Sequence, residues 1–152
     1  MGRGKAGKAR RAGGVVCCEG ELNFPIVLEI PRATPSNNQV LRAYRNGHAK
    51  KRLRQLWELE LACALKGNRG PMKRYVEKNR PRMRLTVLCR RKRLLDPDNL
   101  RGGLKPILDA AKNIGLIVDD RLEFLDHPDP VQEKCGKMRP VTVIEISPVE
   151  VV

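Results

Sequence analysis

Aromatic side chains and long hydrophobic runs are both scarce in this sequence. Phe, Tyr and Trp make up 3% of its 152 residues. No apolar stretch approaches the roughly 20 residues that a helix needs to cross a bilayer, so a membrane protein is not expected. The length suits one domain with one core, because domains commonly hold about 100–200 residues.

Patterns typical of zinc sites and disulfide frameworks are also missing. The five cysteines include no C-x-x-C pair, and neither of the two histidines stands at a zinc-ligand spacing. An odd number of scattered cysteines argues against a set of disulfides and favours a reducing compartment. We therefore expect a cytoplasmic protein without structural zinc.

Acidic residues are few, and their distribution is uneven. The chain has 31 Lys and Arg against 17 Asp and Glu, which gives a formal net charge of +14. Residues 1–95 contain 24 of the basic residues and only six acidic ones, whereas all seven aspartates lie within residues 96–129. The positive charge favours a polyanion as partner, nucleic acid ahead of an anionic membrane surface. The confined aspartates point to a metal site that faces phosphate.

Hydrophobic periodicity predicts a single small α+β domain in the order β-α-β-α-β, with helices packed on a mixed sheet. Residues 1–22 are basic and glycine-rich and are expected to form a disordered tail, which leaves the domain to residues 23–152. We expect strands at residues 24–30, 83–89 and 141–146. We expect helices from Gln39 to a cap at Gly67, interrupted at Gly47, and from Leu100 to Ile114, with a basic connection over residues 68–81.

Asp96 and Asp98 stand two residues apart where a strand gives way to a helix. If the backbone stays extended, both carboxylates point to the same side, with their Cα atoms about 6.5–7 Å apart, which suits one hard cation. The same residues are equally typical of a turn and a helix N-cap. Asp119-Asp120 is likewise typical of a solvated turn, so neither pair decides the chemistry by itself.

The amphipathic helix and the short apolar run that follow can bring Asp120 back beside Asp96 and Asp98. Three carboxylates about 6 Å apart repel one another by roughly 1–3 kcal/mol per pair unless a cation or a proton relieves them. Ligands that are all oxygen favour Mg²⁺, with Mn²⁺ as a substitute, over zinc. Because protein-bound Mg²⁺ commonly binds substrate phosphate, the trio indicates phosphodiester hydrolysis.

Three linked segments resemble the RusA family of Holliday junction resolvases: Asp96-Pro-Asp-Asn-Leu100, Lys105-Pro-Ile-Leu-Asp-Ala110 and Gly115-Leu-Ile-Val-Asp-Asp120. Pro35-Ser-Asn-Asn38, after the first expected strand, is similar to that family's N-terminal motif. The resemblance covers about residues 24–148. It implies a homodimeric, Mg²⁺-dependent α+β endonuclease of bacterial or phage-infected cells. Such an enzyme resolves four-way DNA junctions by paired symmetric nicks in recombination and repair.

The resemblance also implies roles for single residues. The metal ligands would be Asp96, Asp98 and Asp120, and the catalytic lysine would be Lys105. Asn99 and Asp119 are supporting candidates. Carboxylate-held Mg²⁺ would polarise the phosphate and lower the pKa of the attacking water, while the lysine ammonium stabilises charge on the phosphorane or the leaving oxygen.

Lys105 lies further from the aspartate pair than the lysine does in the best-known members of the family. Arg101-Gly-Gly103 occupies the additional space, so Lys105 is matched through its spacing to Asp109. Pro106 is unfavourable inside a helix that has already begun, and the regular helix is therefore expected to start near residues 103–106.

Basic residues on and just after the second expected strand are the predicted contacts to DNA: Arg82, Arg84, Arg90, Arg91, Lys92 and Arg93. Two other functions remain open on the residues alone. One is a non-catalytic basic DNA-binding protein that keeps the fold, and the other is an RNA-associated basic protein. His127, within Asp126-His-Pro-Asp129, is more typical of a polar loop than of a catalytic base.

Overall fold

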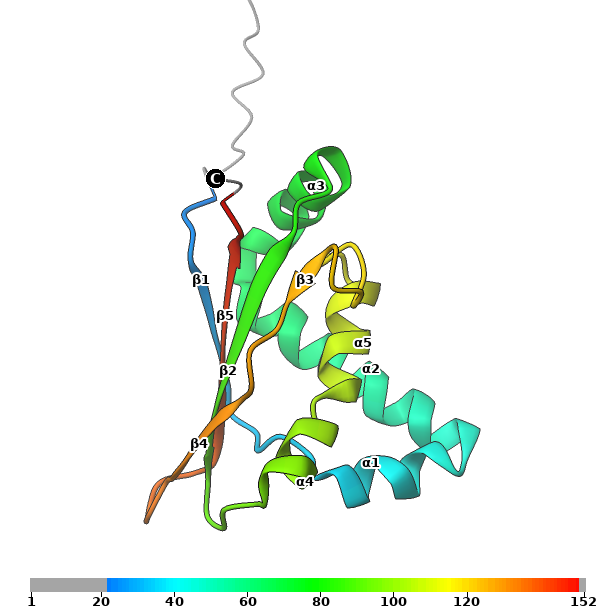
Figure 1. The fold of residues 1–152 in the computed structure, drawn as a ribbon, viewed down its shortest axis with the longest axis vertical. Coiled ribbons are helices and arrows are strands. Elements are labelled where there is room, and N and C mark those ends of the chain that lie inside the picture. The colour runs from blue at the N-terminus through cyan, green and yellow to red at the C-terminus, as the bar shows by residue number, and fades with distance from the viewer. Residues whose placement is uncertain (1–21, 151–152) are drawn as a thin grey trace, which may run out of the picture.

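A five-stranded mixed sheet forms one layer of the molecule, and the helices form a second layer on one of its faces (Figure 1). The computed structural model describes residues 22–150. The expected α+β class, with helices packed on a mixed sheet, is confirmed. Leu22, the last residue of the expected tail, packs partly buried against the core. The rest of that tail lies outside the described residues.

The strands follow the order β1, β5, β2 across the sheet, and two short strands pair with the far edge of β2. β1 (Ile26–Ile30) and β2 (Met83–Arg91) both run antiparallel to β5 (Val141–Pro148), which lies between them. β3 (Leu125–Asp126) and β4 (Val131–Lys134) run parallel to β2. These two strands are too short to show an alternating pattern, so the sequence does not predict them.

Alternation along β2 places one row of apolar side chains toward the helices and a mostly polar row on the opposite face. The four residues predicted to point inward are all buried: Met83, Leu85, Val87 and Cys89. Trp57 and Ile107, from the helix layer, are almost fully buried in the same core. The core therefore lies between one face of the sheet and the helices.

Two helices follow β1, α1 (Asn37–Tyr44) and α2 (Gly47–Leu65), and the break between them confirms the interruption expected at Gly47. Asn46 causes the new start, because its side chain accepts a hydrogen bond from the backbone N–H of His48 at 2.9 Å. α2 is 19 residues long and carries charged residues over most of its length. Within residues 22–150, no helix is both long and apolar enough to cross a membrane.

The expected connection over residues 68–81 is wrong, because most of it is a helix, α3 (Arg69–Asn79). Met72 and Val76 are buried at helical spacing, and the partly buried Tyr75 packs against the same core. Pro71 lies near the start of the helix, where its missing N–H costs no intrahelical bond. The glycine and proline in this stretch masked a helical pattern of apolar residues.

The cap expected at Gly67 is also wrong. The residue that ends α2 is Lys66, with φ of +54°, and Lys66–Asn68 continues as one 3-10 turn that leads into α3. Gly67 itself has no positive φ. The chain thus turns at a lysine in a conformation that glycine adopts more readily.

The helix expected from Leu100 to Ile114 is divided into α4 (Pro97–Gly102) and α5 (Lys105–Asn113). α5 begins one residue before Pro106, which confirms the start expected from that proline. The division occurs at Gly102 and Gly103. α5 lies against α2 in the helix layer, and α4 adjoins α1 (Figure 1).

Gly102 and Gly103 allow the segment after β1 to approach the junction of α4 and α5. A Cβ at Gly103 would overlap the carbonyl oxygen of Pro35 and lie 2.9 Å from its carbonyl carbon. A Cβ at Gly102 would lie 2.8 Å from the Cβ of Asn37. Only hydrogen fits at Gly103, because the opposing atoms belong to the backbone and have no rotamer to change.

Replacing Gly103 with Ala should destabilise the protein by about 1–3 kcal/mol, the usual cost of forcing extra atoms into a packed contact. Gly67→Ala is the matched control, because nothing lies within 4 Å of a Cβ at that position. Urea unfolding followed by circular dichroism measures both variants. Equal midpoints for Gly103→Ala and the wild type would contradict the close contact.

Candidate active site

Four segments that are separate in the sequence are joined in two pairs within the helix layer. The backbone N–H of Asn38 donates to Oδ1 of Asn99 at 3.2 Å, which joins the segment after β1 to the start of α4. Nζ of Lys105, at the start of α5, donates to Oδ2 of Asp120 at 3.3 Å. Each of the two contacts therefore joins two of the segments that carry the family resemblance.

Asp96 is the N-cap of α4. Its Oδ1 accepts a hydrogen bond from the backbone N–H of Asn99 at 2.9 Å, and Pro97 is the first helical residue. Asp98 therefore lies in the first turn of a helix, and the two aspartates do not share the extended backbone that is one of the two interpretations left open. Its side chain is 95% exposed. The sequence left an N-cap open as one interpretation of Asp96, and the structure shows Asp96 in that role.

Arg101 lies between Asp98 and Asp129. Its Nε and Nη2 donate to the two carboxylate oxygens of Asp129 at 2.9 and 3.0 Å, and its Nη1 lies 3.6 Å from Oδ1 of Asp98. The hydrogen bonds to Asp129 raise the pKa of Arg101 and lower the pKa of Asp129. This fork attaches the last turn of α4 to the segment before β4.

Lys105 is held by two carboxylates. Its Nζ lies 3.1 Å from Oδ1 of Asp109, one turn along α5, and 3.3 Å from Oδ2 of Asp120. Burial lowers the pKa of Lys105, but the hydrogen bonds and charges of the two carboxylates outweigh it and raise that pKa above its usual value. Lys105 is therefore an ammonium ion at neutral pH, fixed in position on both sides.

Tyr44, at the end of α1, donates a hydrogen bond from its hydroxyl to Oδ2 of Asp109 at 3.0 Å. Burial, together with this hydrogen bond, raises the pKa of Tyr44 well above its usual range, so the hydroxyl stays protonated. Tyr44 and Lys105 thus bind opposite oxygens of one carboxylate. The sequence does not indicate this role for Tyr44, because 65 residues separate it from Asp109.

Asp119 and Asp120 are adjacent, but their surroundings differ. Asp119 accepts hydrogen bonds from Lys112 at 2.9 Å, from Arg121 at 3.0 Å and from the backbone N–H of Asp120 at 2.7 Å. The bond from Lys112, followed by the others, holds the pKa of Asp119 well below its usual range. Asp119 shapes the turn, and Asp120 is the carboxylate that faces Lys105.

Within residues 22–150, no three His, Cys, Asp or Glu side chains come together as a metal site requires. The structure places Asp96 and Asp98 at the start of α4 and pairs Asp120 with Lys105, so the expected convergence of the three is not seen. The donor set is chemically suited to Mg²⁺, because all its donors are carboxylate oxygens and Asp98 is almost fully exposed. The metal and its ligands remain predictions.

Most of the basic residues on and around β2 that are predicted to bind DNA form hydrogen bonds or ion pairs within the protein. Nε of Arg84 lies 2.6 Å from Oδ2 of Asp126 in β3, and Nε of Arg90 lies 2.6 Å from Oε1 of Glu133 in β4. Arg82 donates to the carbonyl of Leu122. Because β3 and β4 bring acidic residues to this face, its positive charge is lower than the sequence of β2 indicates.

The remaining predicted DNA contacts lie at the end of β2. Arg91 donates to the carbonyl and the hydroxyl of Thr34, both at 3.0 Å, and burial lowers its pKa. Lys92 and Arg93 are exposed and, within the described part of the chain, form no ion pair. His127 lies with Nδ1 3.4 Å from the carbonyl oxygen of Leu85, at the start of the loop after β3.

Comparison with protein-family models finds none that matches the chain, and comparison with curated proteins finds no match.

Proposed function

We propose that this protein is a divalent-metal-dependent endonuclease that resolves four-way DNA junctions. The observation that carries the proposal is the meeting of Lys105 with Asp120, beside the contact of Asn38 with Asn99. Each contact joins two of the segments that resemble the RusA family. A lysine held between two aspartates in a strongly basic protein is suited to hydrolysis of a polyanion.

Lys105 supplies the fixed positive charge for this chemistry. Attack of water on a phosphodiester increases the negative charge on the phosphoryl and leaving oxygens, and an ammonium already in place stabilises that charge. Asp109 orients Lys105 through its Oδ1, and Tyr44 holds the same carboxylate through its Oδ2. Bound through Asp96, Asp98 and Asp120, Mg²⁺ would polarise the phosphate and lower the pKa of the attacking water.

A non-catalytic DNA-binding protein of the same fold is the second candidate. The observation that favours it is the engagement of the acidic residues by protein cations, with Arg101 between Asp98 and Asp129. Both candidates bind DNA, and they differ in whether the junction is cut. The substitutions below separate them.

Replacing Asp98 or Asp120 with Asn should abolish cleavage of a labelled four-way junction in Mg²⁺ and leave junction binding equal or tighter. Each change removes a metal ligand and also a negative charge that repels phosphate. Glu29→Gln, on the outward face of β1, is the control and should cleave normally. Cleavage by either Asn variant at the wild-type rate would exclude the proposed metal ligands. A wild-type protein that binds the junction without cutting it would favour the second candidate.

Lys105→Ala should lower the cleavage rate by about 10²–10³ with little change in junction binding, a loss typical of a removed donor at a developing charge. Because the pKa of Lys105 is raised, its ammonium persists as the pH rises from 7 to 9. The wild-type rate should therefore show no fall in this range from loss of the lysine proton. Single-turnover rates across that range test both statements, with Lys78→Ala on α3 as the control. A Lys105→Ala variant that cleaves like the control would exclude the catalytic role.

A four-way junction has a two-fold axis in its open form, and paired nicks on opposing strands require two active sites. We therefore propose a symmetric homodimer. Light scattering at micromolar concentration should give twice the 17.2 kDa mass of the chain, and a cruciform plasmid should be linearised by coupled nicks. A monomer with and without DNA that makes only uncoupled nicks would exclude resolution and leave a structure-selective nuclease.

A further inference from the structure

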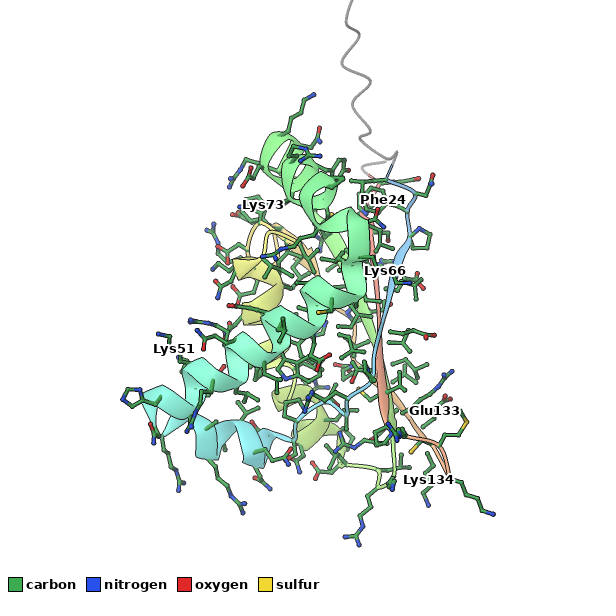
Figure 2. All side chains as sticks on the ribbon, turned by 180° about the vertical axis from the view of Figure 1, so that it is seen from behind. Phe24, Lys51, Lys66, Lys73, Glu133 and Lys134 are labelled. Atoms are coloured by element: carbon green, nitrogen blue, oxygen red, sulfur yellow. The ribbon has the colours of Figure 1, made fainter. Side chains whose placement is uncertain are left out.

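The corner where α1 meets α2 carries a dense group of basic residues, here called the elbow: Arg42, Arg45, Lys50, Lys51 and Arg52. All five are exposed, as is His48 between them. Residues 30–57 contain no Asp or Glu. Figure 2 shows Lys51 at the end of the helix layer that extends away from the sheet, with the neighbouring side chains directed into solvent.

The elbow differs from the basic surfaces of β2, α4 and α5 because no carboxylate of the described residues neutralises it. On β2, α4 and α5, carboxylates pair with arginine and lysine within 4.0 Å, as in Arg84 with Asp126 and Arg101 with Asp129. Among residues 22–150, no acidic side chain lies within that distance of any elbow residue. Lys50 instead lies over the ring of Tyr44, 4.6 Å from its centroid.

This arrangement has a cost for the free protein. Like charges that are close on one surface repel one another, and basic residues near the N-terminus of α2 are opposed by the positive end of the helix dipole. Neither α1 nor α2 has an acidic residue in its first turn to offset this. An external polyanion is the partner that relieves the repulsion.

The elbow adjoins the candidate active site through Tyr44. The Tyr44 ring lies under Lys50, and its hydroxyl binds Asp109, which also holds Lys105. A duplex whose phosphates lie on the elbow would therefore extend toward Lys105 and Asp120. The face of β2, where Asp126 and Glu133 pair with the arginines, has no such link to Lys105 among the described residues.

We propose that the elbow binds the phosphate backbone of one duplex arm of the DNA substrate and directs it into the site at Lys105. The identity of the polyanion rests on the proposed function, whereas the location rests on charge and geometry. The contact is to phosphates, so it gives affinity and orientation without reading base sequence. The elbow replaces Arg84 and Arg90 as the main surface for DNA.

Three triple variants of equal charge change test this location. The first is Arg42→Gln, Lys51→Gln and Arg52→Gln on the elbow. The second is Arg82→Gln, Lys92→Gln and Arg93→Gln, directly before and after β2. The control is Lys134→Gln, Lys137→Gln and Arg139→Gln near the connection of β4 and β5, where Figure 2 shows Lys134 far from Lys51.

Fluorescence anisotropy with a labelled four-way junction and a matching duplex, in EDTA at 50–300 mM NaCl, measures binding without cleavage. Each phosphate contact contributes about 0.9 to the slope of log affinity against log salt, so the elbow variant should lose up to about 3 from that slope. Its affinity should fall about tenfold or more near physiological salt. The other two variants should keep slopes close to that of the wild type.

An elbow variant with the wild-type slope, or a larger loss in the β2 variant, would overturn the proposal. So would a loss of binding to an RNA duplex of equal length with DNA binding unchanged. Failure of the binding proposal and failure of the cleavage proposal can be told apart. If the wild-type protein does not cut the junction but the elbow variant binds DNA more weakly than the wild type, only the proposed function is refuted. If the elbow variant cuts the junction at the wild-type rate and binds it with the wild-type affinity, only the DNA-binding role of the elbow is refuted. Thermal unfolding should show the elbow variant at least as stable as the wild type, because the change removes repulsion.

Discussion

The close approach of the Pro35 carbonyl to Gly103 is the contact on which the rest of the site depends. It allows the segment after β1 to lie against the junction of α4 and α5, where Asn38 reaches Asn99. α1 begins in that segment, so the same contact sets the direction of α1 and brings Tyr44 to Asp109. The absence of a side chain at Gly103 thus helps to position α1 against α4 and the hydrogen bond of Tyr44 to Asp109, the carboxylate that contacts Lys105.

Charge in this protein is balanced by tertiary contacts, and the balance differs between surfaces. β3 and β4 bring Asp126 and Glu133 to the arginines of β2, because both short strands lie along its edge. The elbow receives no such partners, since the chain from residue 30 to residue 57 has no acidic residue. The elbow therefore keeps its positive charge and lies beside the site, whereas β3 and β4 balance part of the positive charge that the sequence of β2 indicates.

The environment of Lys105 follows from the same principle of paired charges. Two carboxylates from different segments raise its pKa and hold its Nζ, so the lysine is both charged and fixed. Asp119 is engaged by three donors and leaves Asp120 to face the lysine. Preorganised charge of this kind stabilises a transition state without reorganisation during the reaction.

The sequence by itself determined the α+β class, the inward row of β2 and the helix start at Lys105, because alternation, helical spacing and proline act over a few residues. The family resemblance also placed Lys105 and Asp120 in one predicted site, as catalytic lysine and metal ligand. The structure alone decided that Asp98 lies in a helix, that residues 69–79 form α3, and that Tyr44 holds Asp109. The contact of Tyr44 with Asp109 joins positions 65 residues apart, and no local pattern encodes such a distance. The helix at Asp98 and α3 rest on local features that the sequence left ambiguous, namely the cap at Asp96 and the spacing of Met72 and Val76 among glycine and proline.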